Sequence, residues 1–326
     1  MKPVVMLVGA ALVGIFGAAL SPPGNANAED YPTQLIKIVV PNPPGGPGDV
    51  ITRAFAERTS QKLPKGFVVE YRAGASTTIG TSAVVKAKPD GYTLLSLPSA
   101  GLAVSVLRKK LPYNLETDLR PVIGVGSVPL ALIVRAKLEF KTIDEFAAAA
   151  RKGNLFYGSG GVGTVGHLTS LALLEELKGT ATHVPFQGNP EVMQAIVSNS
   201  LDYFFGSIAD AIAFSKSPEV QILGVTADRR VKGLESIPTM AELGLPKINS
   251  KLWYAFMAPS QTPADRINRL FDAFAEVAKD PALQQQLSTF GFNVEVRDAD
   301  ALSQMMKEEA ARWKRLIEVN NIAINE

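Results

Sequence analysis

The order of apolar and polar segments along the chain predicts an α/β protein. Ile36–Val40 (IKIVV) is a short apolar run typical of a buried strand. The next segment, PNPPGGPGD, holds prolines and glycines that exclude regular structure, and we expect Asp49 at its end to cap a helix. Further strands are predicted at Phe67–Glu70 and Tyr92–Leu97, with a helix at Thr77–Lys86 between them. This β-loop-α-β-α-β order is typical of a parallel sheet.

A second series of the same kind follows. Leu130–Val134 (LALIV) predicts a buried strand, and Thr142 caps a predicted helix, Ile143–Arg151. Leu155–Tyr157 leads into a second glycine-rich loop and then a helix that Gly179 closes. We therefore expect two α/β units in series with a helical tail. The remaining predicted strands are His183–Phe186, Leu201–Phe205, Ile222–Thr226 and Trp253–Ala258, and the remaining helices are Pro190–Ser198, Pro263–Lys279, Pro281–Phe290 and Ala299–Val319.

Composition excludes several kinds of site. The 326 residues include no cysteine and two histidines, His167 and His183, which excludes disulfides, thiolate metal sites and multi-histidine metal sites. Lys and Arg total 33, and Asp and Glu total 31, so neither charge dominates. The charge balance therefore does not favour binding to nucleic acid or to a membrane surface. We expect no metal and no cofactor.

The N-terminus predicts export. Lys2 precedes an apolar run, Val4–Leu20, which Pro22 and Pro23 interrupt, and Ala26-Asn27-Ala28 fits a small-x-small cleavage site. The alternative is a membrane anchor, but a run of about 17 residues is short for a span. We expect residues 1–28 to be a signal peptide cleaved after Ala28. Its removal takes away one lysine and lowers the net charge from +2 to +1. The mature chain is then expected in a bacterial periplasm.

The two glycine-rich loops offer the same chemistry. The first presents backbone N–H groups of Gly45, Gly46, Gly48 and Asp49 at a helix N-terminus, where an anion is favoured. The second contains Gly158-x-Gly160-x-x-Gly163, with hydroxyl donors at Ser159 and Thr164. His167 lies one helical turn after Thr164, and without an acid partner in sequence it is expected to support the loop or pack.

A carboxylate can be held by such loops without any cation. A hydrogen bond to a charged group contributes roughly 1.5–3 kcal/mol. Micromolar affinity needs about 8 kcal/mol. Four such bonds, together with burial of apolar ligand surface, therefore suffice for micromolar affinity after the entropy cost of ordering the ligand and the loops.

Two enzyme classes fit the sequence less well. A dinucleotide site needs an acid at the end of the following strand, and His183–Phe186 ends without one. A serine esterase needs Gly-x-Ser-x-Gly, and Tyr157 stands where the first glycine belongs. We therefore expect a binding protein rather than an NAD-dependent enzyme or an esterase.

An ordered series of motifs carries a family resemblance. The segments YPTQLIKIVVPNPPGGPGD, VVEYRAGASTTIGTSAVVKAKPDGYTLL, KKLPYN, YGSGGVGTVGHL, HVPFQG, ILGVTADRR, SIPTMAELGLP and APSQTPADRINRL occur in that order. The chain thus resembles the Bug/TctC family, the extracytoplasmic solute-binding receptors of tripartite tricarboxylate transport systems. The resemblance runs from about Tyr31 to the C-terminal helices.

The resemblance implies a type II periplasmic binding protein, a two-lobed α/β Venus flytrap with two crossover strands near Leu130–Val134 and Trp253–Ala258. Residues 29–127 and 252–326 would form lobe 1, and residues 128–251 lobe 2. The two loops would hold a ligand carboxylate through main-chain amides and ordered waters. The matching positions are Pro43, Pro44, Gly45, Gly46 and Asp49 in the first loop, and Ser159, Gly160, Gly163, Thr164 and His167 in the second.

Departures from the family pattern bear on the ligand. Family members often have Phe at Asn42, Asn at Tyr71, two glycines at Ser76 and Thr77, and Asp at Gly206. Without an acid at Gly206, an amino-acid ligand loses an ammonium partner. The segment Leu97–Ala103, including Pro98 and Ser99, is smaller and less polar than the common pattern, and by strand alternation one of Phe204 and Phe205 faces the cleft. Phe205 and Gly206 complete the predicted site.

These features predict the ligand and the partners. We expect a monocarboxylate with an apolar or aromatic body, or a medium-length dicarboxylate, ahead of amino acids and citrate-like ligands. The resemblance implies delivery to membrane permease subunits, and we expect a monomer. The alternative is an exported sensory module in which the same cleft reports to a signalling receptor.

Overall fold

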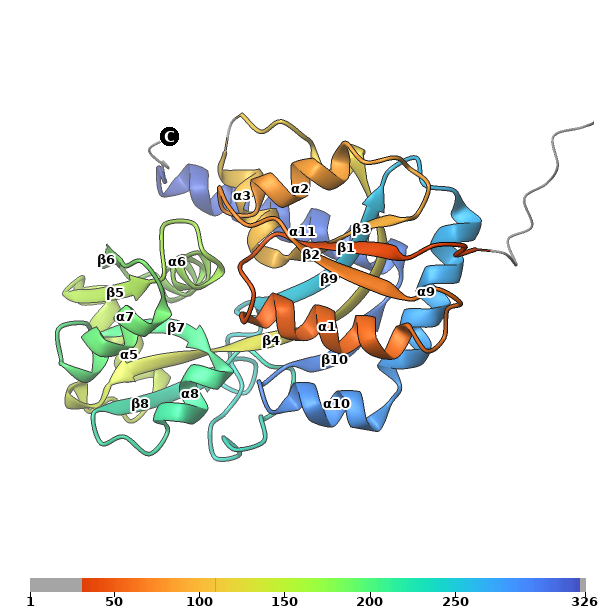
Figure 1. The fold of residues 1–326 in the computed structure, drawn as a ribbon. Helices are drawn as coiled ribbons and strands as arrows, with labels where there is room; N and C mark the ends of the chain where they lie inside the picture. The colour runs from red at the N-terminus through yellow and green to blue at the C-terminus, as the bar shows by residue number, and fades with distance from the viewer. Residues whose placement is uncertain (1–30, 109, 323–326) are drawn as a thin grey trace, which may run out of the picture. The chain divides into compact units, whose positions relative to one another are not determined.

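The strands of this computed structural model join into one sheet, which Figure 1 shows. The structure describes residues 31–108 and 110–322, so the predicted signal peptide lies outside the described residues. The strands are β1 Ile36–Val40, β2 Phe67–Tyr71, β3 Thr93–Pro98, β4 Leu119–Arg135, β5 Leu155–Ser159, β6 Ala181–Pro185, β7 Tyr203–Ser207, β8 Val220–Val225, β9 Lys251–Pro259 and β10 Asn293–Arg297. Their order is β2-β1-β3-β9-β4-β7-β5-β6, and β8 and β10 also pair with β4.

Helices connect most of these strands. They are α1 Pro47–Thr59, α2 Thr78–Val85, α3 Ser99–Leu107, α4 Leu115–Asp118, η2 Ala136–Leu138, α5 Ile143–Lys152, α6 Val165–Leu177, α7 Asn189–Val197, α8 Ile208–Phe214, α9 Ala264–Ala278, α10 Pro281–Ser288 and α11 Ala299–Val319. β1 pairs in parallel with β2 and β3, and β5 pairs in parallel with β6 and β7. The two predicted parallel α/β units are therefore confirmed.

The long strand β4 connects the two parts of the sheet. Leu119–Pro129 of β4 pairs with β9, and Leu130–Arg135 pairs with β7 and β8. β4 and β9 run antiparallel and are the two crossover strands. The sequence predicted the apolar half of β4 and missed the half that contains Pro121, Gly124, Gly126 and Pro129, because prolines and glycines interrupt the apolar pattern.

Five other elements are absent from the sequence expectation: α3, α4, η2, α8 and β10. α3 was not predicted, because SAGLAVSVL has no polar face to give it a helical period. α8 and β10 are short and were missed for the same lack of a pattern. The N-cap of α1 is Gly46 and not Asp49, because the helix already begins at Pro47.

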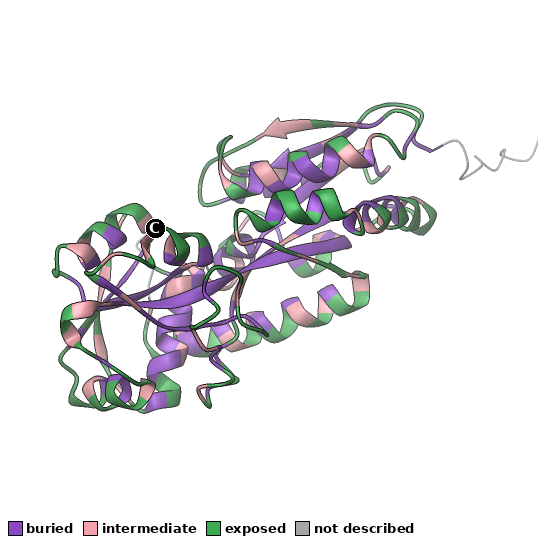
Figure 2. Cartoon of the chain, turned by 90° about the horizontal axis from the view of Figure 1, so that it is seen from below, coloured by how far each residue is buried: buried purple, intermediate pink, exposed green. Residues whose placement is uncertain are grey.

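The interior is apolar, as Figure 2 shows by the buried colouring of the central strands and the exposed outer faces of many helices. β1 is buried along almost its whole length, as expected for a parallel strand covered on both faces. α9 presents Ile267, Leu270, Phe274 and Val277 on one face, and all four are buried. No helix of residues 31–108 and 110–322 is long and apolar enough to span a membrane.

One acidic residue interrupts the buried face of α11. Leu302, Met306, Trp313 and Leu316 lie at helical spacing on this face, and Glu309 takes the position between Met306 and Trp313. Trp253 on β9 donates its indole N–H to Glu309 over 2.5 Å, and Arg312 lies 3.6 Å away. Burial raises the pKa of Glu309 to about 7, although Trp253 and Arg312 oppose the shift.

Glu309 should make the folded protein less stable as the pH rises. The native carboxyl keeps its proton up to about pH 7, whereas the unfolded one loses it near 4.5, so stability falls between these values. Glu309→Gln should therefore raise the thermal midpoint at pH 8 by about 2 °C or more and change it little at pH 4. Scanning calorimetry at both pH values measures this. Glu308→Gln is the control, and equal effects of the two variants would refute the assignment.

Candidate functional site

The predicted site residues lie at the carboxyl ends of four strands. The first loop follows β1, and Pro98 ends β3 and is the N-cap of α3, where Ser99 is the first residue. Ser159 ends β5, and Gly206 lies near the end of β7. β1 and β3 are parallel neighbours, as are β5 and β7. The loops that follow each pair of strands therefore lie side by side at the carboxyl ends of those strands.

Asp49 holds the first loop in place from the first turn of α1. Its carboxylate accepts hydrogen bonds from the amide of Gly45 at 2.8 Å, from Arg53 Nε at 2.7 Å and from the hydroxyl of Tyr71 at 2.6 Å. Burial by itself would raise the pKa of Asp49, but the bonds from Tyr71, Gly45 and Arg53 outweigh it and lower the pKa. The carboxylate is thus ionised and fully engaged within the loop. Arg53 follows Asp49 by four residues on the same helix, whereas no local pattern indicates that Tyr71 on β2 reaches Asp49.

Some backbone N–H groups of the two loops are already bound within the protein. The amide of Gly45 is bound to Asp49, and the amide of Asp49 donates to the carbonyl of Gly46. In the second loop, the amide of Gly163 donates to His167. The loop amides of Gly46, Gly160 and Val162 have no hydrogen-bond partner among the described residues, and neither has the amide of Gly48 in the first turn of α1. These main-chain donors remain available to an anion.

The second loop is fixed by side chains on both sides of it. Thr164 is the N-cap of α6, and its hydroxyl oxygen accepts from the amide of His167. His167 Nδ1 accepts the N–H of Gly163 over 2.9 Å, so the imidazole proton is assigned to Nε2. The Ser159 hydroxyl donates to the carbonyl of Gly161 at 2.8 Å and lies 2.7 Å from His183 Nε2. His167 and Ser159 therefore support the loop in this structure.

Four stacked rings lie beneath the second loop. Tyr157, His183 and Tyr203 are register partners on the parallel strands β5, β6 and β7, so their side chains form one row. The rings of His167 and His183 stack with centroids 3.9 Å apart and an interplanar angle of 9°. Burial, with the nearby His183, lowers the pKa of His167 to about 3, and burial lowers the pKa of His183 to about 4. Both imidazoles are neutral at pH 7.

The histidine pair should make the protein sensitive to acid. The unfolded histidines take up protons near pH 6.5, but the folded ones do so only near 3 and 4, so stability falls as the pH drops from about 6.5 toward 4. Urea unfolding between pH 7 and pH 4.5 should show this fall in the free energy of unfolding. The slope reports the protons taken up on unfolding, and His183→Gln should lower that number by about one. An unchanged slope in that variant would contradict the assignment of His183.

Phe205 and Gly206 lie within the packed part of β7. Phe204 and Phe205 are both buried, so neither ring is an open surface in this structure. A Cβ atom added to Gly206 would lie 2.8 Å from Phe204 Cζ and 2.9 Å from Ile133 Cδ1. The ring of Phe204 therefore occupies the space that a side chain at Gly206 would need.

The turn before α2 keeps a left-handed backbone without glycine. Ala75, Ser76 and Thr77 have φ values of 46°, 52° and 80°. Left-handed backbone is unfavourable for a β-branched residue. The hydroxyl of buried Thr77 also makes no hydrogen bond. This turn is strained.

Relieving the strain should stabilise the protein. Thr77→Gly removes the clash of a branched Cβ with left-handed backbone and should raise the free energy of unfolding by about 1 kcal/mol. Thr78→Gly is the matched control, because Thr78 is helical and should lose stability on substitution. Chemical denaturation compares them, and a loss of stability in both variants would contradict the strain.

One contact joins the second loop to α3. A Cβ atom added to Gly163, whose φ is +75°, would lie 2.0 Å from Leu107 Cδ1. α3 begins at Ser99, another predicted site residue, so this helix extends from the end of β3 to the second loop. Within residues 31–108 and 110–322, no group of three or more His, Asp and Glu side chains is placed to hold a metal ion.

Two parallel half-sheets joined by crossover strands, with glycine-rich loops at the strand ends, define a two-lobed periplasmic binding protein. The family model described as "Tripartite tricarboxylate transporter family receptor" matches residues 51–322. Protein BugT of Bordetella pertussis (strain Tohama I) is 31% identical over 312 residues, which cover 94% of this chain and 95% of BugT. The chain therefore belongs to the TctC family of tripartite tricarboxylate transporter receptors.

Two solved structures of similar proteins contain a ligand. MatC from Rhodopseudomonas palustris with bound malate is 28% identical, with a TM-score of 0.71, over 88% of this chain and 100% of MatC. A second R. palustris protein, with adipate, is 26% identical, with a TM-score of 0.74, over 90% of this chain and 99% of the other. The family and the fold are those of solute-binding proteins.

Proposed function

We propose that this protein is exported to the periplasm, captures an organic carboxylate and delivers it to the permease subunits of a tripartite tricarboxylate-type transporter. The observation that carries the proposal is the set of free amides of Gly46, Gly160 and Val162 beside the N-termini of α1 and α6. Helix N-termini attract anions, and backbone amides bind a carboxylate without a cation. Arg53, on the helix that follows the first loop, is already paired with Asp49.

The proposed ligand is a medium-length dicarboxylate or a monocarboxylate with an apolar or aromatic body. The malate and adipate in similar proteins support a carboxylate. Gly206 provides no acid for a ligand ammonium group, and Phe204 fills the space of a side chain there. We therefore expect amino acids to bind more weakly than these carboxylates.

The proposed site lies between two lobes, residues 29–127 with 252–326 and residues 128–251. All fifteen predicted residues belong to it, with Asp49, Ser159 and His167 supporting the loops whose amides touch the ligand. A ligand that contacts both loops binds the closed form better, so binding closes the lobes. We propose that the signal peptide is cleaved after Ala28 and that the mature protein works as a monomer.

A thermal-shift screen tests the proposal. The screen pairs each carboxylic acid with its uncharged amide, for example adipate with adipamide. Adipate or a related acid should raise the thermal midpoint, and its amide should not, because the amide carries no negative charge for the free N–H groups. Equal stabilisation by acid and amide would refute the carboxylate claim.

A further inference from the structure

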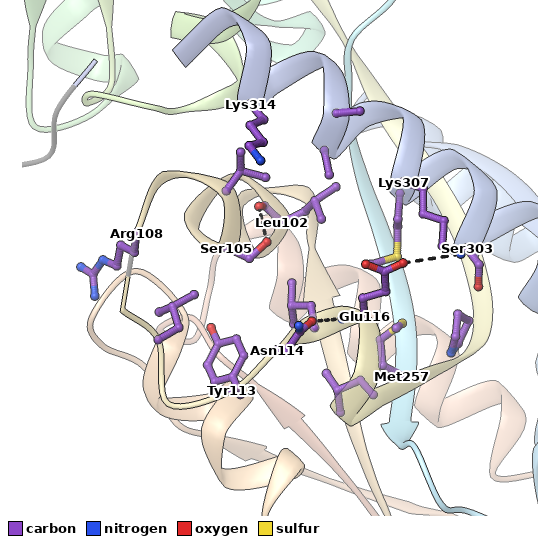
Figure 3. A pocket seen from close by; sticks show the side chains of 18 residues that line it. Leu102, Ser105, Arg108, Tyr113, Asn114, Glu116, Met257, Ser303, Lys307 and Lys314 are labelled. Carbon is purple, nitrogen blue, oxygen red and sulfur yellow. Dashed lines mark hydrogen bonds and ion pairs between the residues drawn. The ribbon is translucent and has the colours of Figure 1, made fainter. Parts of the chain in front are cut away.

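A second pocket lies away from the glycine-rich loops, between α3, α4 and α11. Its volume is about 620 Å³, within the range of small-molecule sites, and it includes none of the predicted site residues. Figure 3 shows side chains from these helices directed toward one space. The pocket is therefore separate from the proposed carboxylate site.

The lining of this pocket is part apolar and part polar, and its charges are mainly positive. Leu102 and Val106 from α3 and Met306 from α11 supply apolar surface. Three of the lining residues are cations, Arg108, Lys307 and Lys314, and one is an anion, Glu116. An apolar wall with an excess of positive charge favours an amphipathic anion.

Lys314 is the cation best placed for an anionic group. Lys307 lies 3.5 Å from Glu116 and is thereby paired. The ammonium group of Lys314 forms no ion pair or hydrogen bond within the part of the chain that the structure describes, and it is directed toward Leu102 and Ser105 (Figure 3). An anion in the pocket would meet this group without displacing another partner.

Tyr113 contributes apolar surface to the pocket. Its side chain lines the pocket and is 8% exposed, and its hydroxyl oxygen is buried away from the open space. The ring therefore extends the apolar part of the lining.

We infer that this pocket binds an amphipathic organic anion, with its acidic group at Lys314 and its apolar body against α3 and α11. The inference does not depend on the ligand of the glycine-rich loops. Decanoate, a medium-chain carboxylate, is a suitable probe because it has one charge and an apolar chain.

Calorimetric titration of decanoate in the presence of saturating adipate tests the inference, because adipate keeps the proposed carboxylate site occupied. Decanoate should bind in a 1:1 ratio, and decanol should bind at least about tenfold more weakly because it has no charge. Absence of decanoate binding, or equal affinity for decanol, would overturn the inference.

Variants locate the binding. Lys314→Glu should weaken decanoate binding by about tenfold or more. Ala311→Trp should block binding by filling the pocket from an exposed position of α11. Lys216→Glu, the same charge change outside the pocket, should bind as the wild type does. If Lys314→Glu and Ala311→Trp each bind decanoate with wild-type affinity, the decanoate does not bind in this pocket.

Discussion

Gly163→Val is expected to abolish carboxylate binding while the protein remains folded. The new side chain would have to share the position of Leu107 Cδ1, 2.0 Å from its Cβ, and a branched residue would also have to adopt a φ of +75°. Leu107 can shift its methyl group, but a branched residue cannot keep this left-handed backbone without strain, so we expect the loop to move and displace the free amides of Gly160 and Val162. We expect affinity for the best carboxylate of the screen to fall by about 100-fold or more. Calorimetric titration measures it, and circular dichroism checks the fold.

A double-mutant cycle separates the clash from the backbone strain. Gly163→Ala should weaken binding, and adding Leu107→Ala should restore part of the affinity by removing the atom that clashes. Leu107→Ala alone is the control. Unchanged affinity in Gly163→Val would remove the second loop from the site.

Gly126→Ala is expected to be among the most destabilising single substitutions in the chain. Gly126 has a φ of +144°, and a Cβ atom there would lie 2.1 Å from the backbone oxygen of Asn293 and 2.7 Å from the ring of Phe292. Backbone oxygen cannot rotate away, so β10 would have to separate from β4. We expect a loss of roughly 4 kcal/mol or more, seen as a large drop in the denaturant midpoint.

Gly124→Ala is the matched control for this effect. Gly124 lies on the same strand, but the nearest atom to its added Cβ is Arg297 Cβ at 3.1 Å, so a shift of a few tenths of an ångström relieves the contact. Its cost should be much smaller. Equal stability of Gly126→Ala and the wild type would show that the junction of β4 and β10 tolerates a side chain.

The sequence predicted local features of the site well. The loop after β1 and the loop after β5 were each found from glycines between an apolar run and a helix, and α11 was predicted at its observed bounds. These signals are local, because turn residues and helical periodicity act within a few positions. The order of the two α/β units followed from the same patterns.

The contacts that fix the loops could not be predicted. Tyr71 reaches Asp49 from a neighbouring strand, and His183 reaches Ser159 only because β6 lies beside β5 in a particular register. No local pattern records which strands become neighbours. The sequence therefore indicated amide donors in both loops, but not that internal bonds occupy those of Gly45 and Gly163.

Amide chemical shifts test the central claim most directly. In ¹⁵N-labelled protein, adding adipate, or the best carboxylate of the screen, should shift the amide proton resonances of Gly46, Gly160 and Val162 downfield, because these groups gain charge-assisted hydrogen bonds. The matched amide should leave them in place. If the carboxylate shifts none of the three, or if acid and amide shift them alike, the two loops are not the carboxylate site.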